Sequence, residues 1–157
     1  MTPAINAIRK AKIKHQVHEY AHDPDNQAYG AETVEKLGLP AERVFKTLVV
    51  NIDNRELVVG VVPVVSMLSM KHLAKAVGAK KAAMANPLDV ERVTGYVLGG
   101  VSPLGQKKRL KTIIDASAQA FPTIYVSAGR RGMQIELSPQ DLKKLTGALF
   151  ADISAAS

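Results

Sequence analysis

Residues 99–115, GGVSPLGQKKRLKTIID, combine two features that a reaction site could use. Glycines and a Ser-Pro pair leave the backbone bare, directly before a basic run that contains Lys107, Lys108, Arg109 and Lys111. Glycine has no side chain to hold a ligand away, so one interpretation is a cradle of bare amides beside a phosphate-binding surface. The alternative is a flexible turn that leads into a solvated strand. This stretch alone leaves both interpretations open.

Lys46 is the second candidate, because it interrupts an apolar strand pattern. In FKTLVVNI, residues 45–52, alternation places its side chain on the same face as Leu48 and Val50. Burial of an ammonium is unfavourable, so a lysine there needs a partner, a lowered pKa or an opening into a pocket. The alternative is an edge-strand lysine that reaches solvent and discourages aggregation. Thr47 falls on the opposite face, with its backbone amide close by.

Other catalytic patterns are missing from the sequence. The chain has no cysteine, which excludes a thiolate nucleophile, a zinc-thiolate site and a disulfide framework. It also lacks a G-x-S-x-G elbow, a Walker phosphate loop and a dinucleotide fingerprint. His15, His18 and His22 could suggest a metal, but residues three apart in a strand point to opposite faces, and no matching carboxylate or cysteine pattern accompanies them. We therefore expect neither a metal nor a cofactor.

The charge balance favours polyanionic partners. Lysine and arginine number 21 against 14 acidic residues, which gives a formal net charge of +7 at pH 7 and long-range attraction to polyanions. Nucleic acid is therefore the leading partner class. The cations form separate groups within residues 71–75, 80–81, 107–111 and 130–131, which folding could bring onto one face. No basic tail is present, so any nucleic-acid contact belongs to the folded body.

The elements that must position these residues are short. Cap and glycine signals predict a helix that begins at Thr2-Pro3 and further helices over 31–38, 69–78, 86–95 and 138–147. Apolar runs predict strands over 15–20, 45–52, 56–63, 110–115, 123–127 and 133–137, with a hairpin turn at Asp53-Asn54. Strands are both consecutive and separated by helices. We therefore expect an α+β or mixed α/β fold, with a mixed, largely antiparallel sheet flanked by short helices.

Length and composition set the frame for this fold. The 157 residues suit a single compact domain over residues 1–157. The hydrophobic fraction is 46% without any tryptophan, which predicts an aliphatic core. The first residues lack the apolar segment of a signal peptide, and no run approaches the ~20 apolar residues that span a bilayer. We therefore expect a cytoplasmic protein.

Six segments together resemble one family. They are TPAI at the start, HDPDNQAYG, FKTL around Lys46, GAKK, TGYVLGGVSPLGQKKR and TIYVSAGRRG. These segments are similar to the YbaK-type Cys-tRNA(Pro) deacylases, relatives of the editing domain inserted in bacterial prolyl-tRNA synthetases. The resemblance spans essentially the whole chain, and TGY-x-x-GG-x-SP-x-GQKKR is its most specific motif. It implies a free-standing enzyme of aminoacyl-tRNA editing that hydrolyses the ester of tRNA(Pro) wrongly charged with cysteine.

The resemblance also implies a site. The family's functional lysine matches Lys46, and its G-x-x-x-P loop matches Gly99 through Pro103, so the candidate catalytic residues are Lys46, Gly99 and Gly100. The candidate substrate-binding residues are Tyr20, Tyr29, Thr47, Val101, Ser102, Pro103, Ser127 and Gln134. The candidate tRNA contacts are Lys107, Lys108, Arg109, Arg130 and Arg131, of which the first three could instead pair with acidic residues.

Ala128 and Gln134 are the two departures from the family pattern that matter, and Tyr29 differs from many relatives as well. Tyr29 stands where relatives commonly have Phe, Ala128 replaces a glycine, and Gln134 occupies a site where some relatives have Asp. None of them is the lysine or a residue of the glycine loop. We therefore expect these departures to affect the fine discrimination of substrates more than the activity.

Aminoacyl esters are already reactive, so the chemistry needs few protein groups. An enzyme has to orient the ester, stabilise its oxyanion and supply a nucleophile. We expect amides near residues 99–102 to stabilise the oxyanion. Lys46 would hold the phosphate or ribose of the terminal adenosine, or polarise the carbonyl. What is known of the family implies that the substrate's own cysteine thiol attacks the ester.

The expected partners follow from this reading. They are aminoacylated tRNA(Pro) and, in a transient complex, prolyl-tRNA synthetase. Two alternatives stay open at this point. One is a non-catalytic module that binds tRNA 3′ ends, and the other is a related deacylase that prefers Ala- or Ser-tRNA.

Overall fold

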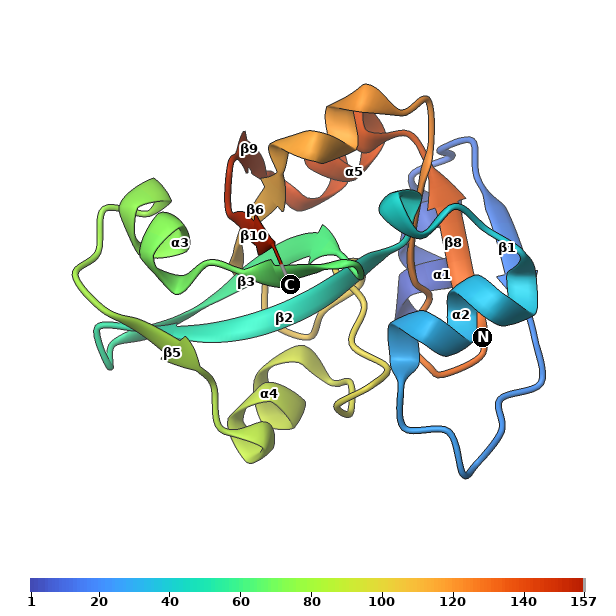
Figure 1. Cartoon of the computed structure of the whole chain (residues 1–157), viewed down its shortest axis with the longest axis horizontal. Helices are drawn as coiled ribbons and strands as arrows, with labels where there is room; N and C mark the ends of the chain where they lie inside the picture. Colours follow the sequence, from blue (N-terminus) through green and yellow to red (C-terminus); the bar gives the residue numbers. More distant parts are fainter. Residues whose placement is uncertain (157) are drawn as a thin grey trace.

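Short helices and short strands alternate along residues 1–156, which the computed structural model describes (Figure 1). The helices are α1 (Pro3–Lys10), α2 (Tyr29–Leu37), α3 (Met70–Ala76), α4 (Pro87–Thr94) and α5 (Pro139–Thr146), with the 3-10 helices η1 (Ala41–Arg43) and η2 (Ala116–Ala120). The strands are β1 (Gln16–Glu19), β2 (Phe45–Ile52), β3 (Glu56–Pro63), β4 (Ser66–Leu68), β5 (Ala82–Met84), β6 (Lys111–Asp115), β7 (Ile124–Ser127), β8 (Met133–Leu137), β9 (Leu149–Ala151) and β10 (Ser154–Ala156). None of the helices within residues 1–156 has the length and apolar character to cross a membrane.

Local sequence signals decide where most helices begin and end. Four helices start after a side chain that accepts a hydrogen bond from a first-turn amide, namely Thr2, Ser69, Asn86 and Ser138. Three helices end at a glycine with positive φ, namely Gly38, Gly95 and Gly147. These predicted helices are confirmed.

α2 begins two residues earlier than predicted, at Tyr29 instead of Ala31. The side chain of Asn26 accepts a hydrogen bond from the Ala28 amide at 2.8 Å, which turns the chain before the apolar pattern starts. Tyr29 and Gly30 therefore belong to the first turn of α2 and not to the preceding loop.

The strands form three sheets. The largest is mixed, with the order β5-β2-β3-β6-β9. In it β2 pairs antiparallel with β3 and β5, whereas β6 lies parallel to both β3 and β9. An antiparallel sheet has the order β1-β8-β7, and β4 pairs with β10. The predicted fold class is confirmed, although the strands are divided among three sheets. Val44, the residue before β2, forms an isolated parallel bridge with Tyr125 of β7.

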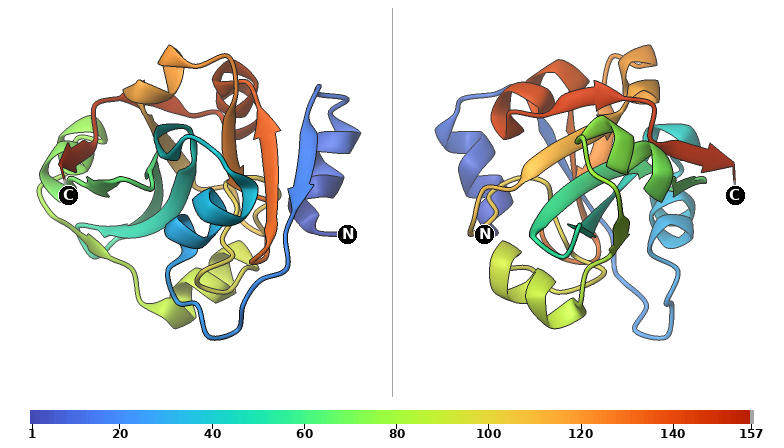
Figure 2. Two further views of the ribbon diagram at one scale, coloured as in Figure 1. Left: turned by 45° about the vertical axis from the view of Figure 1, so that its right-hand side comes forward. Right: turned by 90° about the vertical axis from the view of Figure 1, so that its left-hand side faces the viewer.

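The core lies on both faces of the β2–β3 hairpin. Phe45 and Val49 belong to the larger cluster of buried side chains, which also includes Val90 of α4. Val50 belongs to the smaller cluster, together with Leu73 of α3. α3 and α4 thus lie on opposite faces of the hairpin, as the views in Figures 1 and 2 show. Burial on both faces explains why β2 carries apolar residues at both odd and even positions.

Candidate active site

A cavity of about 370 Å³ opens at the start of β2. We call it the Lys46 cavity. Its walls come from the start of α2, from the first half of β2, from the residue after β3 and from the glycine loop after α4. The lining residues are Ala28, Tyr29, Gly30, Ala31, Lys46, Thr47, Leu48, Val64, Leu98, Gly99 and Val101. The fold thus gathers Lys46, Tyr29, Thr47, Gly99 and Val101, which the sequence placed in one site.

The edge of β2 is open where the cavity lies. β5 pairs with β2 only at Val50–Ile52, so it covers no part of the strand near Lys46. The side chain of Lys46 shares its face with Leu48 and Val50, as alternation predicts. Lys46 and Leu48 are half-buried and Val50 is buried, so Lys46 sits where this apolar face ends.

Lys46 has no anionic neighbour in the fold. Burial lowers the pKa of its ammonium, and within residues 1–156 this group forms no ion pair and no hydrogen bond to a side chain or carbonyl. A partly desolvated cation without a partner attracts a ligand oxygen strongly, because water screens the interaction less than at the surface.

The start of α2 forms another wall of the cavity, to which the helix contributes backbone amides instead of a charged side chain. Its N-cap residue is Ala28, which offers no side-chain acceptor to the first-turn amides. Such amides have no partner within the helix and carry the positive end of its dipole, so they favour negatively charged groups. Gly30 brings this turn close to Val64, because a Cβ added at Gly30 would lie 2.6 Å from the Val64 Cβ. The Lys46 cavity therefore combines an ammonium with a helix N-terminus.

The glycine loop supplies fewer free amides than expected. Gly99 has a φ of +86°, a conformation that favours glycine, and it lines the cavity. The amide of Gly100 donates to the Val97 carbonyl at 3.0 Å, so a turn already uses it. The amides of Gly99 and Val101 have no such partner within residues 1–156.

Two residues of the same loop lie away from the cavity. Ser102 is fully buried, and its Oγ accepts a hydrogen bond from the Leu104 amide at 3.2 Å. Pro103 lines a separate cavity with Leu104 and Gln106. The structure therefore places both residues outside the lining of the Lys46 cavity, and their contact with substrate stays a prediction.

Tyr29 connects the cavity to a polar layer behind it. Its hydroxyl accepts a hydrogen bond from Gln134 Nε2 at 2.7 Å, and the Arg131 guanidinium lies 5.6 Å from its ring centroid. Burial raises the pKa of Tyr29 to about 12, against the opposing effect of hydrogen bonds with Gln134 and Ser127. Tyr29 is thus a neutral phenol at physiological pH.

Glu32 is the buried anion of this layer. Its carboxylate lies 3.0 Å from Arg131 Nη2 and 2.6 Å from His22 Nδ1, and it accepts the Asp23 amide at 2.9 Å. Burial alone would raise the pKa of Glu32, but the hydrogen bonds from Asp23, His22 and Arg131 outweigh burial and lower it to about 2. An ionised Glu32 thus ties α2 to the loop before it and to the turn between β7 and β8.

Tyr20 belongs to the same layer and does not line the cavity. Its hydroxyl shares a hydrogen bond of 2.9 Å with Thr33 Oγ1 on α2. Ser127 is buried, and its Oγ accepts a hydrogen bond from the Gly129 amide at 3.1 Å. Both residues therefore support the wall around Tyr29 from behind.

Three buried polar atoms near Tyr29 have no hydrogen-bond partner within residues 1–156. They are Thr47 Oγ1, which lines the cavity, Gln134 Oε1, whose amide holds Tyr29, and Arg131 Nε, whose guanidinium covers Tyr29. Buried polar atoms in folded proteins are nearly always paired. Unpaired atoms around one tyrosine therefore indicate a place for a polar ligand group.

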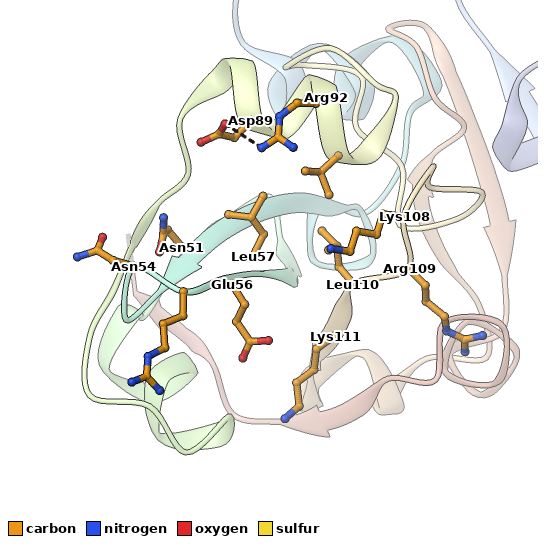
Figure 3. Close-up of a pocket in the computed structure, with 12 residues that line it drawn as sticks. Asn51, Asn54, Glu56, Leu57, Asp89, Arg92, Lys108, Arg109, Leu110 and Lys111 are labelled. Atoms are coloured by element: carbon orange, nitrogen blue, oxygen red, sulfur yellow. Dashed lines mark hydrogen bonds and ion pairs between the residues drawn. The ribbon is translucent and has the colours of Figure 1, made fainter.

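The predicted tRNA contacts do not form one patch. Lys108 and Arg109 line a second cavity of about 370 Å³, which shares no residue with the Lys46 cavity (Figure 3). Figure 3 also shows Glu56 and Asp89 there, and Asp89 binds Arg92 at 3.2 Å. Lys107 is exposed and outside this cavity.

The two arginines of the turn between β7 and β8 differ from each other. Arg130 is exposed, and its Cα would lie 3.1 Å from a Cβ added at Gly100. Arg131 is bound to Glu32 and only 20% exposed at its side chain. Its guanidinium is therefore part of the support for Tyr29, which makes it a poor contact for a tRNA phosphate.

His15, His18 and His22 have protein partners. His18 Nε2 lies 2.9 Å from Glu136 Oε1, and His15 Nδ1 lies 2.7 Å from the Ile13 carbonyl oxygen. Among residues 1–156 no group of three or more His, Cys, Asp or Glu side chains is placed to hold a metal ion.

The family follows from a comparison with known proteins. The model of the aminoacyl-tRNA editing domain matches residues 25–145, which include most of the Lys46 cavity and its supporting layer. The chain belongs to this family. It is 42% identical over 154 residues to the Enterococcus faecalis protein named "Putative Cys-tRNA(Pro)/Cys-tRNA(Cys) deacylase EbsC", a match that covers 98% of this chain and 93% of that protein.

Part of the chain is also similar to much longer proteins, and its fold is found in other solved structures. A proline–tRNA ligase of Trichlorobacter lovleyi is 29% identical over 107 residues, which cover 68% of this chain and 18% of the ligase. The crystal structure of a protein described as a candidate trans-editing enzyme for prolyl-tRNA synthetase shares the fold, with a TM-score of 0.85 at 22% identity over 98% of this chain and 96% of that one.

Several residues that line the Lys46 cavity were not expected from the sequence. They are Ala28, Gly30, Ala31, Leu48, Val64 and Leu98. One signal could have revealed the start of α2: Asn26 stands two residues before Ala28, the spacing at which an asparagine side chain holds a turn. Val64 and Leu98 enter through tertiary packing, for which the sequence holds no local signal.

Proposed function

We propose that the protein is a trans-editing aminoacyl-tRNA deacylase that hydrolyses the ester of tRNA(Pro) mischarged with cysteine. Membership in the editing-domain family and the likeness to EbsC support the reaction class. The observation that carries the proposal is the unpaired ammonium of Lys46 opposite the uncapped start of α2. Both groups attract the oxygens of an esterified tRNA 3′ end.

The cavity has two kinds of wall for the two parts of this substrate. Lys46 and the first-turn amides of α2 would hold the phosphate or ribose of the terminal adenosine, or polarise the ester carbonyl. The unpaired Thr47 Oγ1, which lines the cavity, would accept a hydrogen bond from the substrate's ammonium. The cavity volume of about 370 Å³ suits an aminoacyl group with part of a ribose, and not a whole nucleotide chain.

The substrate's own thiol would supply the nucleophile, which explains why the chain needs no cysteine and no catalytic triad. A bond forms between the cysteine sulfur and the ester carbonyl carbon while the carbon–oxygen bond to the ribose breaks. The thiol proton ends on the released ribose hydroxyl. Water then opens the cyclic thioester to give free cysteine. The protein has to orient the ester and stabilise the oxyanion, for which Lys46 and the free amides of Gly99 and Val101 are available.

Selectivity against correctly charged tRNA would be chemical. Proline has no thiol, so a prolyl ester in the cavity lacks the nucleophile even if it binds. The decisive experiment is a deacylation assay on tRNA(Pro) charged separately with Cys, Ala, Ser and Pro. We expect the Cys ester to be hydrolysed much faster than the other three.

Other outcomes of this assay lead to other functions. Comparable rates for the Cys and Ser esters indicate attack by a bound water, because the serine oxygen is a far poorer nucleophile than sulfur. A preference for the Ala ester makes the protein a deacylase of another specificity. No hydrolysis of any ester overturns the proposal in favour of a module that only binds tRNA 3′ ends.

We further propose that the protein works in the cytoplasm in a transient complex with prolyl-tRNA synthetase. A domain of this size offers few contacts to distinguish one tRNA from another, and a complex would raise the effective concentration of tRNA(Pro). The isolated protein should therefore hydrolyse Cys-tRNA(Pro) and Cys-tRNA(Cys) at similar rates, and added synthetase should favour the former. Strong discrimination by the protein alone would contradict this.

A further inference from the structure

α3 and β5 enclose a groove of about 640 Å³ in which every charged side chain is a lysine. We call it the lysine groove. Its rim consists of Lys71, Lys75, Lys80 and Lys81, and its remaining lining residues are Met70, Ala74, Ala79, Ala82 and Ala83. Figure 1 shows α3 beside β5 near the tip of the β2–β3 hairpin. The alanine side chains are short and uncharged, so the charge of this groove comes from its lysines alone.

The fold brings together two lysine pairs that are separate in the sequence. Lys71 and Lys75 are four residues apart on α3 and therefore share one face of the helix. The chain turns back after α3, and β5 then pairs with β2, with Ala82 opposite Ile52. This pairing places Lys80 and Lys81 across from α3.

The four ammonium groups have no anionic partner. Within residues 1–156 none of them takes part in an ion pair, and all four side chains are exposed. The carboxylate of Asp53 accepts the backbone amides of Lys80 and Lys81, at 3.1 and 2.7 Å, which fixes this segment without neutralising its side chains. A groove with four unpaired charges of one sign is suited to a polyanion.

The groove lies on the face of β2 that carries Lys46. Leu73 of α3 packs with Val50 and Ile52. These two residues lie at every second position from Lys46 and therefore share its face of β2. Lys46 and Ile52 are six residues apart along β2, so the groove begins about 20 Å from Lys46 at the rise of an extended strand. A few nucleotides of single-stranded RNA cover such a distance.

The cavity in Figure 3 fits a polyanion less well. Glu56 and Asp89 stand among its cations, and Arg92 is already paired. It also adjoins α4, which packs on the face of the hairpin opposite to the Lys46 side chain.

We propose that the lysine groove binds phosphates of the tRNA acceptor end while the Lys46 cavity holds the aminoacylated 3′ terminus. This inference rests on the proposed function, since it assigns tRNA as the polyanion. Binding of tRNA to the groove can nevertheless be measured without any deacylation, so the two proposals can fail separately.

The test compares two double variants that each remove two positive charges. Lys75→Gln with Lys80→Gln alters the groove, and Lys10→Gln with Lys14→Gln alters exposed lysines at and after α1 as a matched control. Binding of fluorescently labelled, uncharged tRNA(Pro) is measured by anisotropy over a series of salt concentrations, and single-turnover deacylation of Cys-tRNA(Pro) is measured at saturating protein.

We expect the groove variant to bind uncharged tRNA about tenfold more weakly at low salt, and the slope of log K against log salt to fall by about two. The control should retain the wild-type slope. Single-turnover deacylation at saturation should be unchanged in both, because neither variant alters the Lys46 cavity.

Equal effects in the two variants would overturn the inference, because net charge alone would then explain them. It is also overturned if the groove variant binds as the wild type does, or if the wild type binds no tRNA, since an acidic protein would then be the better partner. Groove-dependent binding without hydrolysis of any ester would support the groove and refute the deacylase. Hydrolysis of the Cys ester together with tRNA binding that does not depend on the groove would support the deacylase and refute the groove.

Discussion

Lys46 holds a half-buried positive charge without an anion beside it, and the cavity around it limits what can replace it. Its ammonium is compact, and Lys46 lines the same cavity as the start of α2 and the glycine loop. Burial lowers its pKa, so the fold disfavours the charged form that a substrate oxygen would favour. Position and charge should therefore both matter at this residue.

Lys46→Arg tests position and size at constant charge. A guanidinium is broad and planar, and its fork would collide with walls shaped for an ammonium. We expect kcat/KM for Cys-tRNA(Pro) to fall at least about tenfold, toward the range seen when a single oxyanion-stabilising donor is lost. The thermal melting curve should stay close to that of the wild type. Activity near the wild-type level would reduce Lys46 to a general electrostatic role.

The first turn of α2 is the element on which the site depends most. Its residues Tyr29, Gly30 and Ala31 line the cavity, and its position is set by the contact between Gly30 and Val64 and by the ion pairs of Glu32. Sequence signals placed the other helices well, since Thr2, Ser69, Asn86 and Ser138 mark their starts. The start of α2 has no such residue at its N-cap, which is why the predicted helix began at Ala31 and did not include Tyr29 and Gly30.

Gly30→Ala tests the approach of α2 to the cavity. The added methyl group would meet Val64 at 2.6 Å, so the first turn must move outward. We expect a loss of about 1–3 kcal/mol in the free energy of unfolding and a lower rate of Cys-tRNA(Pro) deacylation. Adding Val64→Gly should restore part of the deacylation rate, because it removes the Cβ and both Cγ atoms that the new methyl group would meet.

Gly38→Ala is the matched control at the other end of α2. A Cβ there meets nothing within 4 Å, but φ is +63°. Gly38→Ala should lower the free energy of unfolding by about 1–2 kcal/mol, because alanine is strained at this φ, and should leave the deacylation rate unchanged. If both alanine variants lowered the deacylation rate equally, general destabilisation would explain the result and the cavity wall would not.

Glu32→Gln tests the clamp between α2 and the turn between β7 and β8. The pKa of Glu32 is about 2 in the folded protein and about 4.5 ordinarily, so its ionisation stabilises the fold above pH 4.5, and this contribution is lost as pH falls toward 2. The variant should be less stable than the wild type in urea at pH 7, and the difference should shrink between pH 4.5 and 2. A difference that is constant over this range would show that the carboxylate's charge contributes nothing.

At the scale of the whole molecule, the sequence predicted local structure better than tertiary placement. The β2–β3 hairpin and the capped helices have signals within a few residues, and so does Lys46 as an exception in an apolar strand. The strands β4, β5, β9 and β10 have three residues each, too few to show alternation. The positions of the basic groups depend on how distant segments pack, which explains why Lys108 and the lysine groove could not be placed beforehand.

We propose that the whole chain is one domain. The two buried clusters lie on opposite faces of the same β2–β3 hairpin, so neither can form without it. A domain with a shared central hairpin should lose both clusters in a single unfolding transition. The Lys46 cavity lies at the start of this hairpin. Deacylation activity should therefore be lost in the same unfolding transition as the two buried clusters.

We infer that the aminoacyl ester is cleaved in the Lys46 cavity. The most direct test is single-turnover deacylation of Cys-tRNA(Pro) by the wild type and by Lys46→Met, which removes the ammonium and keeps the apolar part of the side chain. Lys14→Met, at an exposed lysine outside the cavity, is the control. We predict a fall of about a hundredfold to a thousandfold for Lys46→Met, with an unchanged melting temperature and a fully active control. A Lys46→Met protein that deacylates Cys-tRNA(Pro) as fast as the wild type would contradict the account.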